Sequence, residues 1–288
     1  MEVWIIYALI WMLCTGIFWI LQKIDSESSM NRNGFIFYAH LWAVVISIWA
    51  AIFTKTDFIH SFQLLPLAMI ASISYFIVLR LRLSCLKFMS SSSYFINYRI
   101  FVSIILLLWG QFLFNEFIVT SEYIWVFLWF IVFYLLLEQK QDKKWKENLK
   151  TGYIYLWLSI LIASILWLFQ KWIMIQDFDV LTYVLYSGIF WSLASLIFKW
   201  KDNLKNILTI TSRKHLLFLL ITALSFGIWY YFNLMALQGG WDVAVVYKII
   251  SYSLFFPIIF SILFFKEELS LKRIIAFILT IISIFLFV

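Results

Sequence analysis

Charge is what this sequence has least of. Only 13% of its 288 residues are Asp, Glu, Lys or Arg, whereas soluble domains carry about 25%. Hydrophobic residues, counted with Tyr and Cys, make up 65%, which is too large a share for a single water-facing surface to hide. This excludes an ordinary soluble globular protein. The same balance excludes a disordered chain, which needs low hydrophobicity and high charge.

Residues that hold metals or form disulfides are also scarce. Cys14 and Cys85 lie in apolar or near-apolar runs, so we expect two small buried side chains and no disulfide framework. His40, His60 and His215 are scattered and form no His-x-x-x-His pair. No Gly-x-x-x-x-Gly-Lys-Ser/Thr phosphate loop occurs. The sequence therefore predicts no metal, no cofactor and no ATP site.

Long apolar runs dominate what is present. A helix needs about 20 apolar residues to cross the hydrocarbon core of a bilayer. Ten runs approach or reach this length: 3–22, 35–53, 64–86, 93–113, 119–137, 152–171, 180–199, 215–236, 243–265 and 271–288. The first is expected to be retained, because no positive residue precedes it and no cleavage site closes it. The predicted fold class is an all-α integral membrane protein with ten transmembrane helices.

The two halves of the chain share short motifs. Four matches occur in order: residues 18–23 with 166–171, Tyr38 with Tyr186, residues 98–100 with 247–249, and residues 114–116 with 265–267. Their nearly constant offset predicts two five-helix repeats, 1–138 and 152–288, joined by a polar linker over 139–151. An odd number of helices inverts the second copy, as in many secondary transporters.

Lys and Arg predict the orientation, because they concentrate on the cytoplasmic side. The five connections on one face carry 18 of the 22 basic residues, whereas the other face has only Lys55 and Lys171. This predicts a multi-pass protein of the cell (cytoplasmic) membrane with both termini outside. The net charge of +7 then reflects topology and contact with membrane lipids rather than nucleic acid.

The end of the chain has a familiar pattern. Pro257 stands ten residues before Glu267, and a last apolar helix follows at once. Met235-Ala236-Leu237 is followed by Gly239-Gly240. This pattern resembles the EamA type of the drug/metabolite transporter superfamily, whose members have a proline in helix nine and a Glu-bearing turn before helix ten. The resemblance covers essentially the full chain and implies a secondary transporter for small metabolites.

After the basic residues of the connections are counted, two cations remain inside the predicted spans. Arg99 lies in helix four and Lys248 in helix nine, at equivalent positions of the repeat, directly after Tyr98 and Tyr247. A charge at mid-membrane costs about 2.5–3.5 kcal/mol, so we expect this pair to bind a carboxylate or phosphate. The alternative is snorkelling, because their depth is only about 8 Å. One face of helix four is predicted to carry Phe95, Arg99, Val102 and Leu106.

Aromatic and amide side chains three or four residues apart suit a cavity for a polar organic molecule. Three such pairs occur: Trp19 with Gln22, Trp167 with Gln170, and Trp229 with Asn233. The alternative for the first two is an interfacial belt, because Lys23 and Lys171 follow them directly.

The sequence allows two interpretations for several charged residues. Arg80 and Arg82 lie inside helix three if it spans about 66–87, but at its cytoplasmic end if it starts near His60. Glu116, Glu267 and Glu268 are expected in turns, where a solvated charge is cheap, so a structural role is favoured over proton coupling. A bare Asp-x-Asp pattern at residues 177–179 is the only hint of a metal-dependent enzyme.

The sequence thus predicts a transporter and not an enzyme. The expected cargo is a small polar molecule, anionic or zwitterionic, exported or exchanged by alternating access. A coupling ion and the oligomeric state stay open. The second interpretation is a flippase for a lipid or lipid-linked substrate, and the third is an integral membrane enzyme of the glycosyltransferase type.

Overall fold

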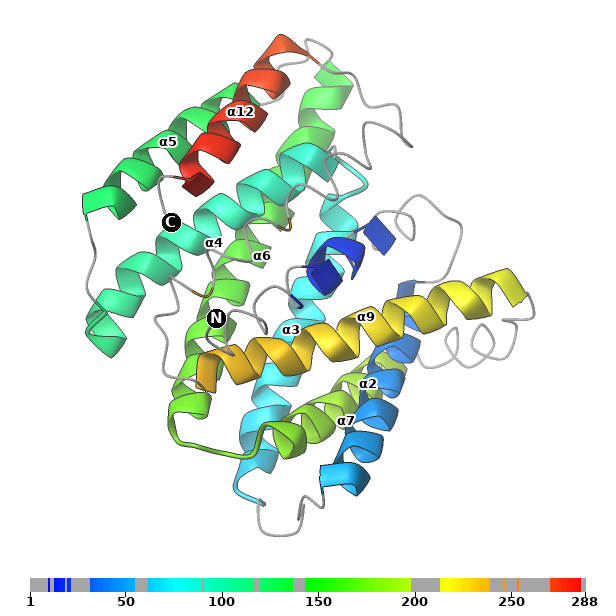
Figure 1. Ribbon diagram of the computed structural model, residues 1–288. Helices are drawn as coiled ribbons and strands as arrows, with labels where there is room; N and C mark the ends of the chain where they lie inside the picture. The colour runs from blue at the N-terminus through cyan, green and yellow to red at the C-terminus, as the bar shows by residue number, and fades with distance from the viewer. Residues whose placement is uncertain are drawn as a thin grey trace.

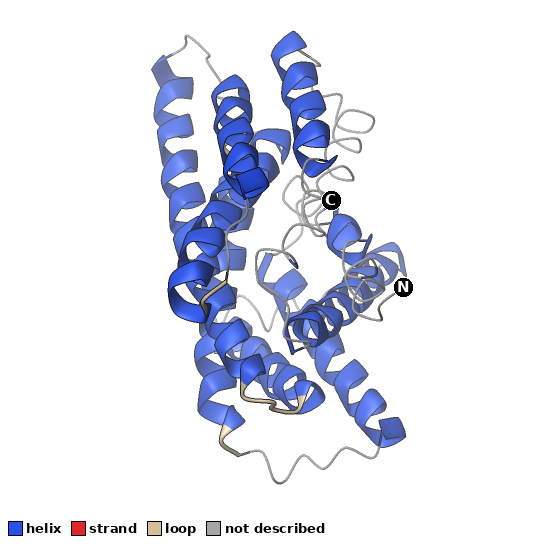
Figure 2. Ribbon diagram, turned by 60° about the vertical axis from the view of Figure 1, so that its left-hand side comes forward, coloured by secondary structure: helices blue, strands red, loops and turns tan. Residues whose placement is uncertain are grey.

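The computed structural model describes residues 10, 13–18, 20–21, 32–54, 62–89, 91–116, 120–136, 143–197, 213–238, 246, 253 and 270–285. These residues form helices and turns without any strand (Figure 2). The helices are α2 (Arg32–Thr54), α3 (Leu64–Cys85), α4 (Ser91–Phe114), α5 (Thr120–Leu136), α6 (Lys143–Ile175), α7 (Val180–Ile197), α9 (Arg213–Gln238) and α12 (Leu271–Phe285). They follow the predicted runs closely. The run over 243–265 lies outside the described residues, apart from Val246 and Ser253.

Five of these helices contain segments long and apolar enough to cross a membrane. The segments are Leu64–Cys85, Ser93–Phe114, Lys150–Ile175, Val180–Ile197 and Leu220–Gln238, and a shorter apolar helix covers His40–Phe53. Helices form here because the bilayer core offers no water, so each backbone N–H and C=O must bond within its own segment. The chain is therefore a multi-pass integral membrane protein.

Helix α6 differs from the prediction at its beginning. The polar stretch predicted as a linker over 139–151 is helical from Lys143, so that α6 runs for 33 residues. At 1.5 Å per residue this is about 50 Å, well beyond the ~30 Å hydrocarbon core. The first turns, from Lys143 to the candidate span that begins at Lys150, account for part of this excess length.

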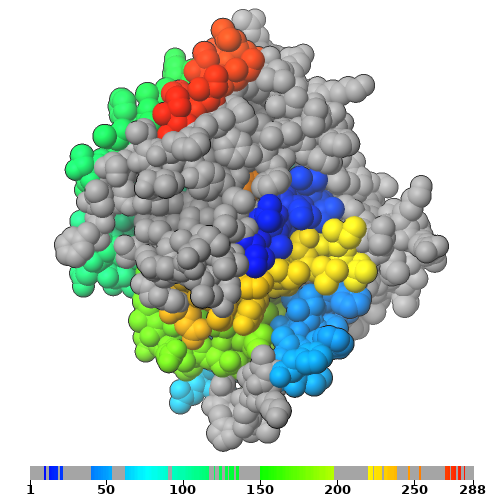
Figure 3. Space-filling view, viewed as in Figure 1, coloured from blue at the N-terminus to red at the C-terminus, as the bar shows by residue number. Residues whose placement is uncertain are grey.

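Helices from the two sequence halves pack against each other (Figure 1). Helix α2 contacts α7 and α9, and α3 contacts α6 and α7. Helices α5 and α12 lie side by side at one edge of the molecule (Figures 1 and 3). The segment before α2 lies against α9, where the rings of Phe18 and Phe226 are 5.3 Å apart (Figure 3). The buried core thus lies between the halves.

Two glycines bring α2 close to its neighbours. A Cβ added to Gly188 of α7 would lie 2.7 Å from Val44 Cγ2 and 3.3 Å from the Val44 backbone nitrogen. A Cβ on Gly227 of α9 would lie 2.8 Å from Cδ1 of Ile46. Small residues permit such close approach of membrane helices. The backbones of α2 and α7 therefore meet near Gly188.

The cysteines are as expected where the structure describes them. Cys85 is buried at the end of α3, Cys14 is half-buried, and both are free thiols. Cys85 Sγ donates to the carbonyl of Gly152 at 3.1 Å, which joins the end of α3 to α6.

Candidate functional site

Arg82 is held inside the protein by tyrosines of the next helix. It lies in the last turn of α3, and only 5% of its surface is exposed. Its Nε donates to the hydroxyl of Tyr94 at 3.2 Å, and its Cζ lies 4.7 Å from the centroid of the Tyr98 ring. Tyr94 and Tyr98 stack with their centroids 5.7 Å apart. Arg82 thus lies at the end of helix three and is nevertheless buried.

Arg99 lies on the predicted face of α4. Phe95, Val102 and Leu106 are buried with it, and Arg99 itself is 3% exposed. Its Nη2 donates to Ser253 Oγ at 3.4 Å, across 154 positions of the chain. A guanidinium of the first half thus reaches a residue of the second half.

A second polar group lies between α6, α7 and α9. Gln170 Nε2 donates to the hydroxyl of Tyr230 at 3.0 Å. Tyr183 of α7 stacks on Tyr230 with centroids 6.3 Å apart. Gln170 and its predicted neighbour Trp167 are both buried between helices.

Four aromatic side chains from three helices join these two groups, with His40 among them. The His40 ring lies 4.7 Å from the Trp191 ring, 4.7 Å from the Phe226 ring and 5.9 Å from the Tyr75 ring. Trp191 also contacts Tyr230 edge-on at 4.7 Å. Tyr75 stands seven residues before Arg82 on α3, so the two side chains share one face of that helix. We call His40, Tyr75, Trp191, Phe226 and Tyr230 the interface aromatic cluster.

Sequence reasoning did not find this cluster. Its members come from α2, α3, α7 and α9 and are separated by up to 190 positions. In a chain with 62 aromatic residues, single rings carry no signal. The spacing of Tyr75 and Arg82 on α3 is the one local signal. They stand seven residues apart, so one member of the cluster shares a helix face with the buried Arg82.

Glu116 and Lys171 correct the prediction most clearly. Glu116 was expected in a turn with a structural role, and it does lie in the turn after α4, but it is buried and not solvated. Lys171, expected in the loop after its helix, lies within α6. Lys171 Nζ lies 2.6 Å from Glu116 Oε1, with side-chain exposures of 4% and 6%. Lys171 Nζ also lies 5.3 Å from the Phe114 ring centroid. The end of α4 is thereby tied to α6.

The turn after α4 explains how the carboxylate returns to the interior. Asn115 takes the left-handed conformation, with φ 55°, as residues that end helices commonly do. The backbone N–H of Glu116 then donates to the carbonyl of Gly110 at 3.5 Å. Glu116 Oε2 lies where a Cβ on Gly110 would stand, so the glycine leaves the space that the carboxylate fills.

The remaining predicted site residues divide into two sets. Arg80 is half-buried with its Cζ 5.7 Å from the Phe76 ring, and Asn233 is buried on α9. Trp229 lies on α9, but its side chain is outside the described residues, as are Trp19, Gln22, Tyr247 and Lys248. The structure thus brings Arg82, Tyr98, Arg99, Trp167, Gln170 and Asn233 into the interior.

The Asp-x-Asp pattern has a structural explanation. Asp179 Oδ2 accepts a hydrogen bond from the backbone N–H of Thr182 at 2.6 Å, which caps the first turn of α7. Asp177 has φ 57° and accepts a bond from Gln238 Nε2 at 3.2 Å. Among the described residues no group of three His, Cys, Asp or Glu side chains could hold a metal. The two aspartates therefore form a turn and not a metal centre.

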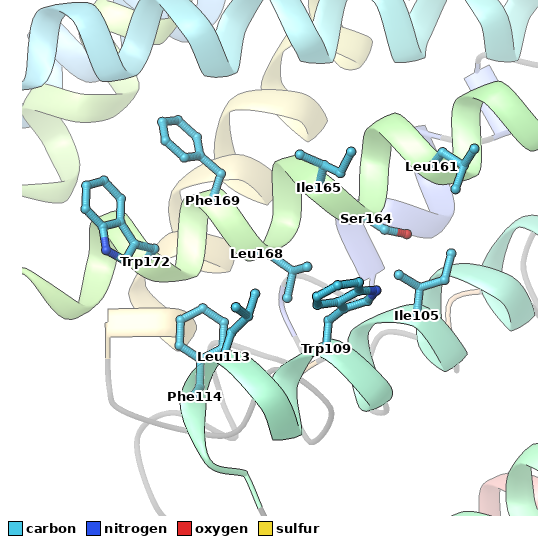
Figure 4. Close-up of a pocket in the computed structure, with 10 residues that line it drawn as sticks. All are labelled: Ile105, Trp109, Leu113, Phe114, Leu161, Ser164, Ile165, Leu168, Phe169 and Trp172. Carbon is cyan, nitrogen blue, oxygen red and sulfur yellow. The ribbon is translucent and has the colours of Figure 1, made fainter.

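An apolar groove of about 580 Å³ runs along the seam of α4 and α6 (Figure 4). Its walls are Ile105, Trp109, Leu113, Phe114, Leu161, Ser164, Ile165, Leu168, Phe169 and Trp172. The hydroxyl of Ser164 donates to the Ile160 carbonyl within α6, so it is not directed at an occupant. The groove is lined by exposed apolar side chains and suits hydrocarbon, not a polar molecule.

Known protein families identify the second half of the chain. The EamA-like transporter family matches residues 150–288. This half is an EamA-like transporter domain. It belongs to the drug/metabolite transporter superfamily, as the resemblance predicted, and the family consists of transporters rather than enzymes. The enzyme interpretation of residues 177–179 is therefore wrong.

Solved structures extend the likeness to the whole chain. Twenty-seven chains of solved structures are similar to this one. One, titled "Crystal structure of protein", is similar with a TM-score of 0.70 and 12% identity over 98% of this chain and 96% of its own. At this identity the likeness shows the fold alone. No curated protein matches the sequence.

An EamA-like transporter moves a small molecule across a membrane without covalent chemistry. The buried polar groups described above are therefore candidates for cargo binding. Two of these contacts join the sequence halves: Arg99 with Ser253, and His40 with the rings of α7 and α9. Arg82 and Gln170 are each held by helices of their own half.

Proposed function

We propose that this EamA-like protein is a secondary transporter that exports or exchanges a small polar metabolite with a carboxylate or phosphate group. The single observation that carries the proposal is the burial of two arginines, Arg82 beside Tyr94 and Tyr98, and Arg99 beside Ser253. A buried guanidinium is costly unless hydrogen bonds and opposite charge compensate it. Arginine also matches carboxylate and phosphate geometry with two parallel hydrogen bonds.

Alternating access between two five-helix halves is the mechanism we propose. The helix contacts support it. A twofold axis that relates the halves would turn the contact of helix two with helix eight (α2 and α9) into a contact of helix seven with helix three (α7 and α3), and both contacts are present. The fifth and tenth helices, α5 and α12, also pair with each other. Residues 1–138 and 152–288 would then rock about the interior, with cargo favouring the two states differently.

The cargo site that we propose combines cations from both halves with aromatic and amide groups. Its charged members are Arg80, Arg82, Arg99 and Lys248, with Tyr98 and Tyr247 beside them. Its other members are Trp19, Gln22, Trp167, Gln170, Trp229 and Asn233. The arginines would bind the anionic group, and the amides and indoles would hold the polar organic remainder.

Ligand binding in detergent tests this site. A probe that binds only the folded state stabilises it by RT ln(1 + [L]/Kd), about 2.7 kcal/mol at 100 times Kd. We expect L-glutamate, citrate, phosphoenolpyruvate or glycerol 3-phosphate to raise the melting temperature, and the cation putrescine to leave it unchanged. Arg82→Met, Arg99→Met and Lys248→Met should each weaken binding of the best probe about 10- to 100-fold, by loss of a charged hydrogen bond.

Folding of these variants separates binding from structure. Lys248→Met should keep the protein folded, because it removes the cost of burying a charge. Lys87→Met is the matched control, since Lys87 is an exposed cation two residues beyond the end of α3. Equal probe affinity in all three variants and the control would leave snorkelling as the better account of the cations.

Orientation is a second expected result. The distribution of basic residues predicts a protein of the cell membrane with both termini outside. A reporter enzyme that is active only outside the cytoplasm should therefore be active when fused after Val288. Activity of a cytoplasm-specific reporter at that position would show that the basic residues do not set the orientation.

A lipid or lipid-linked flippase is the second candidate function, favoured by the apolar groove along α4 and α6. An acyl chain in this groove would remain in the bilayer while its headgroup crosses through the polar interior. Dithionite reduction of a fluorescent phospholipid in proteoliposomes distinguishes the two. Accelerated lipid exchange without binding of soluble anions would favour the flippase.

A further inference from the structure

We propose that His40 is a proton-binding site and that its proton is coupled to the cargo anion at Arg82. This rests on the proposed function for the anion, while the proton site itself stands on the geometry around His40. The imidazole is the side chain that most readily changes charge between pH 5 and 8. It is 0% exposed in this structure and lies between helices of both halves.

The rings around His40 can accept both of its charge states. Trp191, Phe226 and Tyr75 lie 4.7, 4.7 and 5.9 Å from it, centroid to centroid. Neutral imidazole packs well among aromatic rings. An imidazolium within about 6 Å of aromatic faces is stabilised by the ring quadrupoles. A dry cluster therefore favours the neutral ring through desolvation, and entry of water makes the charged form accessible.

The place of His40 in the fold makes this environment dependent on conformation. His40 is on α2, where its carbonyl would lie 3.5 Å from a Cβ on Gly188 of α7. Its ring neighbours lie on α3, α7 and α9, so α2 and α3 of the first half meet α7 and α9 of the second around it. Movement of one half against the other must change which groups surround the ring. Proton affinity then differs between the two states, as coupling requires.

Tyr75 connects the proton site to the cargo site. Its ring lies 5.9 Å from that of His40, and it stands seven residues before Arg82 on the same face of α3. A guanidinium on this face, in a poorly solvated interior, disfavours a second positive charge at His40. An anion bound to Arg82 cancels that repulsion, so anion and proton should each raise the other's affinity by the same factor.

Among the described residues, the titratable groups whose contacts with the rings around His40 are known are tyrosines, together with Cys14 in a nearby segment. Tyr230 of α9 lies beyond Trp191 and bonds to Gln170, and Tyr183 of α7 stacks on Tyr230. Cys14 lies in the segment of residues 13–18, whose Phe18 contacts Phe226. Tyr and Cys side chains are neutral between pH 5 and 8 unless strongly perturbed. Arg82 is therefore the charged group through which we expect the coupling to act.

The first test observes the proton directly and needs no cargo. The chain has three histidines, so His60→Gln with His215→Gln leaves His40 as its only imidazole. With ¹⁵N-labelled histidine in nanodiscs, we expect the His40 ring signals to move from neutral to protonated positions as the pH falls from 8.5 to 5. His40→Asn in the same background removes the signals and assigns them. Ring signals that stay constant over this range would overturn the proposal.

The second test measures coupling with the tightest anion from the thermal screen. One coupled proton changes an affinity by up to about tenfold per pH unit. We expect the Kd of that anion to fall several-fold from pH 8 to pH 6, and His40→Gln to remove this dependence while binding at pH 8 persists. His60→Gln is the control and should keep it. A pH dependence that survives in His40→Gln would overturn the coupling.

The two tests separate this proposal from the proposed function. If His40 titrates but no anion binds, the cargo class is wrong and the proton site stands. If anions bind through Arg82 but His40 does not titrate, the cargo proposal stands and the proton site is wrong.

Discussion

Lys171→Met should lower the free energy of unfolding by about 3–5 kcal/mol, which is the usual cost of removing one partner of a buried ion pair. The lysine lies 2.6 Å from Glu116, and both side chains are almost completely buried. Without it, a carboxylate stays against α4 at Gly110 with its charge uncompensated. SDS titration of the folded protein in mixed micelles measures the loss.

Removing both charges should restore most of this stability. Glu116→Gln combined with Lys171→Met keeps the shape of both side chains and leaves no charge to desolvate, and such replacements are often neutral. Lys150→Met, an exposed lysine on the same helix, is the matched control and should change stability little. A single Lys171→Met variant as stable as this control would show that the pair adds nothing.

Gly188→Leu should prevent assembly of α2 with α7 and leave little folded protein. The added Cβ would lie 2.7 Å from Val44 Cγ2 and 3.3 Å from a backbone nitrogen, and backbone cannot move aside as a side chain can. Gly188→Ala should cost about 1–3 kcal/mol, as overpacking usually does. Yield of monodisperse protein and its SDS midpoint measure both effects.

Gly227→Ala is the matched control for Gly188→Ala. Its Cβ would meet the far end of the Ile46 side chain, which can rotate, and alanine favours a helix over glycine by about 1 kcal/mol. We therefore expect a near-neutral change. Val44→Ala should partly rescue Gly188→Ala, because it removes the nearest atom. If both glycine variants were equally stable, the α2–α7 approach would not depend on Gly188.

The burial of Glu116 bears on how the halves move. The pair joins the end of α4 to α6, which belong to different sequence halves. Any state that separates these two helices must break the contact in a poorly solvated place. The pair therefore favours the arrangement seen here.

The positions of the helices were predictable from the sequence. The predicted runs over 64–86 and 180–199 correspond to α3 (Leu64–Cys85) and α7 (Val180–Ile197). This succeeds because a bilayer requires each span to be apolar, about 20 residues long and internally hydrogen-bonded, and all three conditions are local. The buried face of α4 was predictable for the same reason, since residues three and four apart on a helix share one face.

What lies between the helices was decided only by the tertiary structure. Glu116 and Lys171 are 55 positions apart and each stands at the end of an apolar run, so the sequence did not show that they form a buried pair. Arg82 had two possible positions, and the tyrosines of α4 that fix it are not its neighbours in the chain. His40 had no distinguishing local pattern, because its neighbours Tyr75, Trp191 and Phe226 lie on three other helices. The sequence by itself indicated the apolar helices, five of which are long enough to cross a membrane among the described residues, and, through the EamA-like second half, a membrane transporter. The packing of α2, α3, α7 and α9 decided which polar groups share its interior, because burial and charge pairing depend on contacts between helices far apart in the chain.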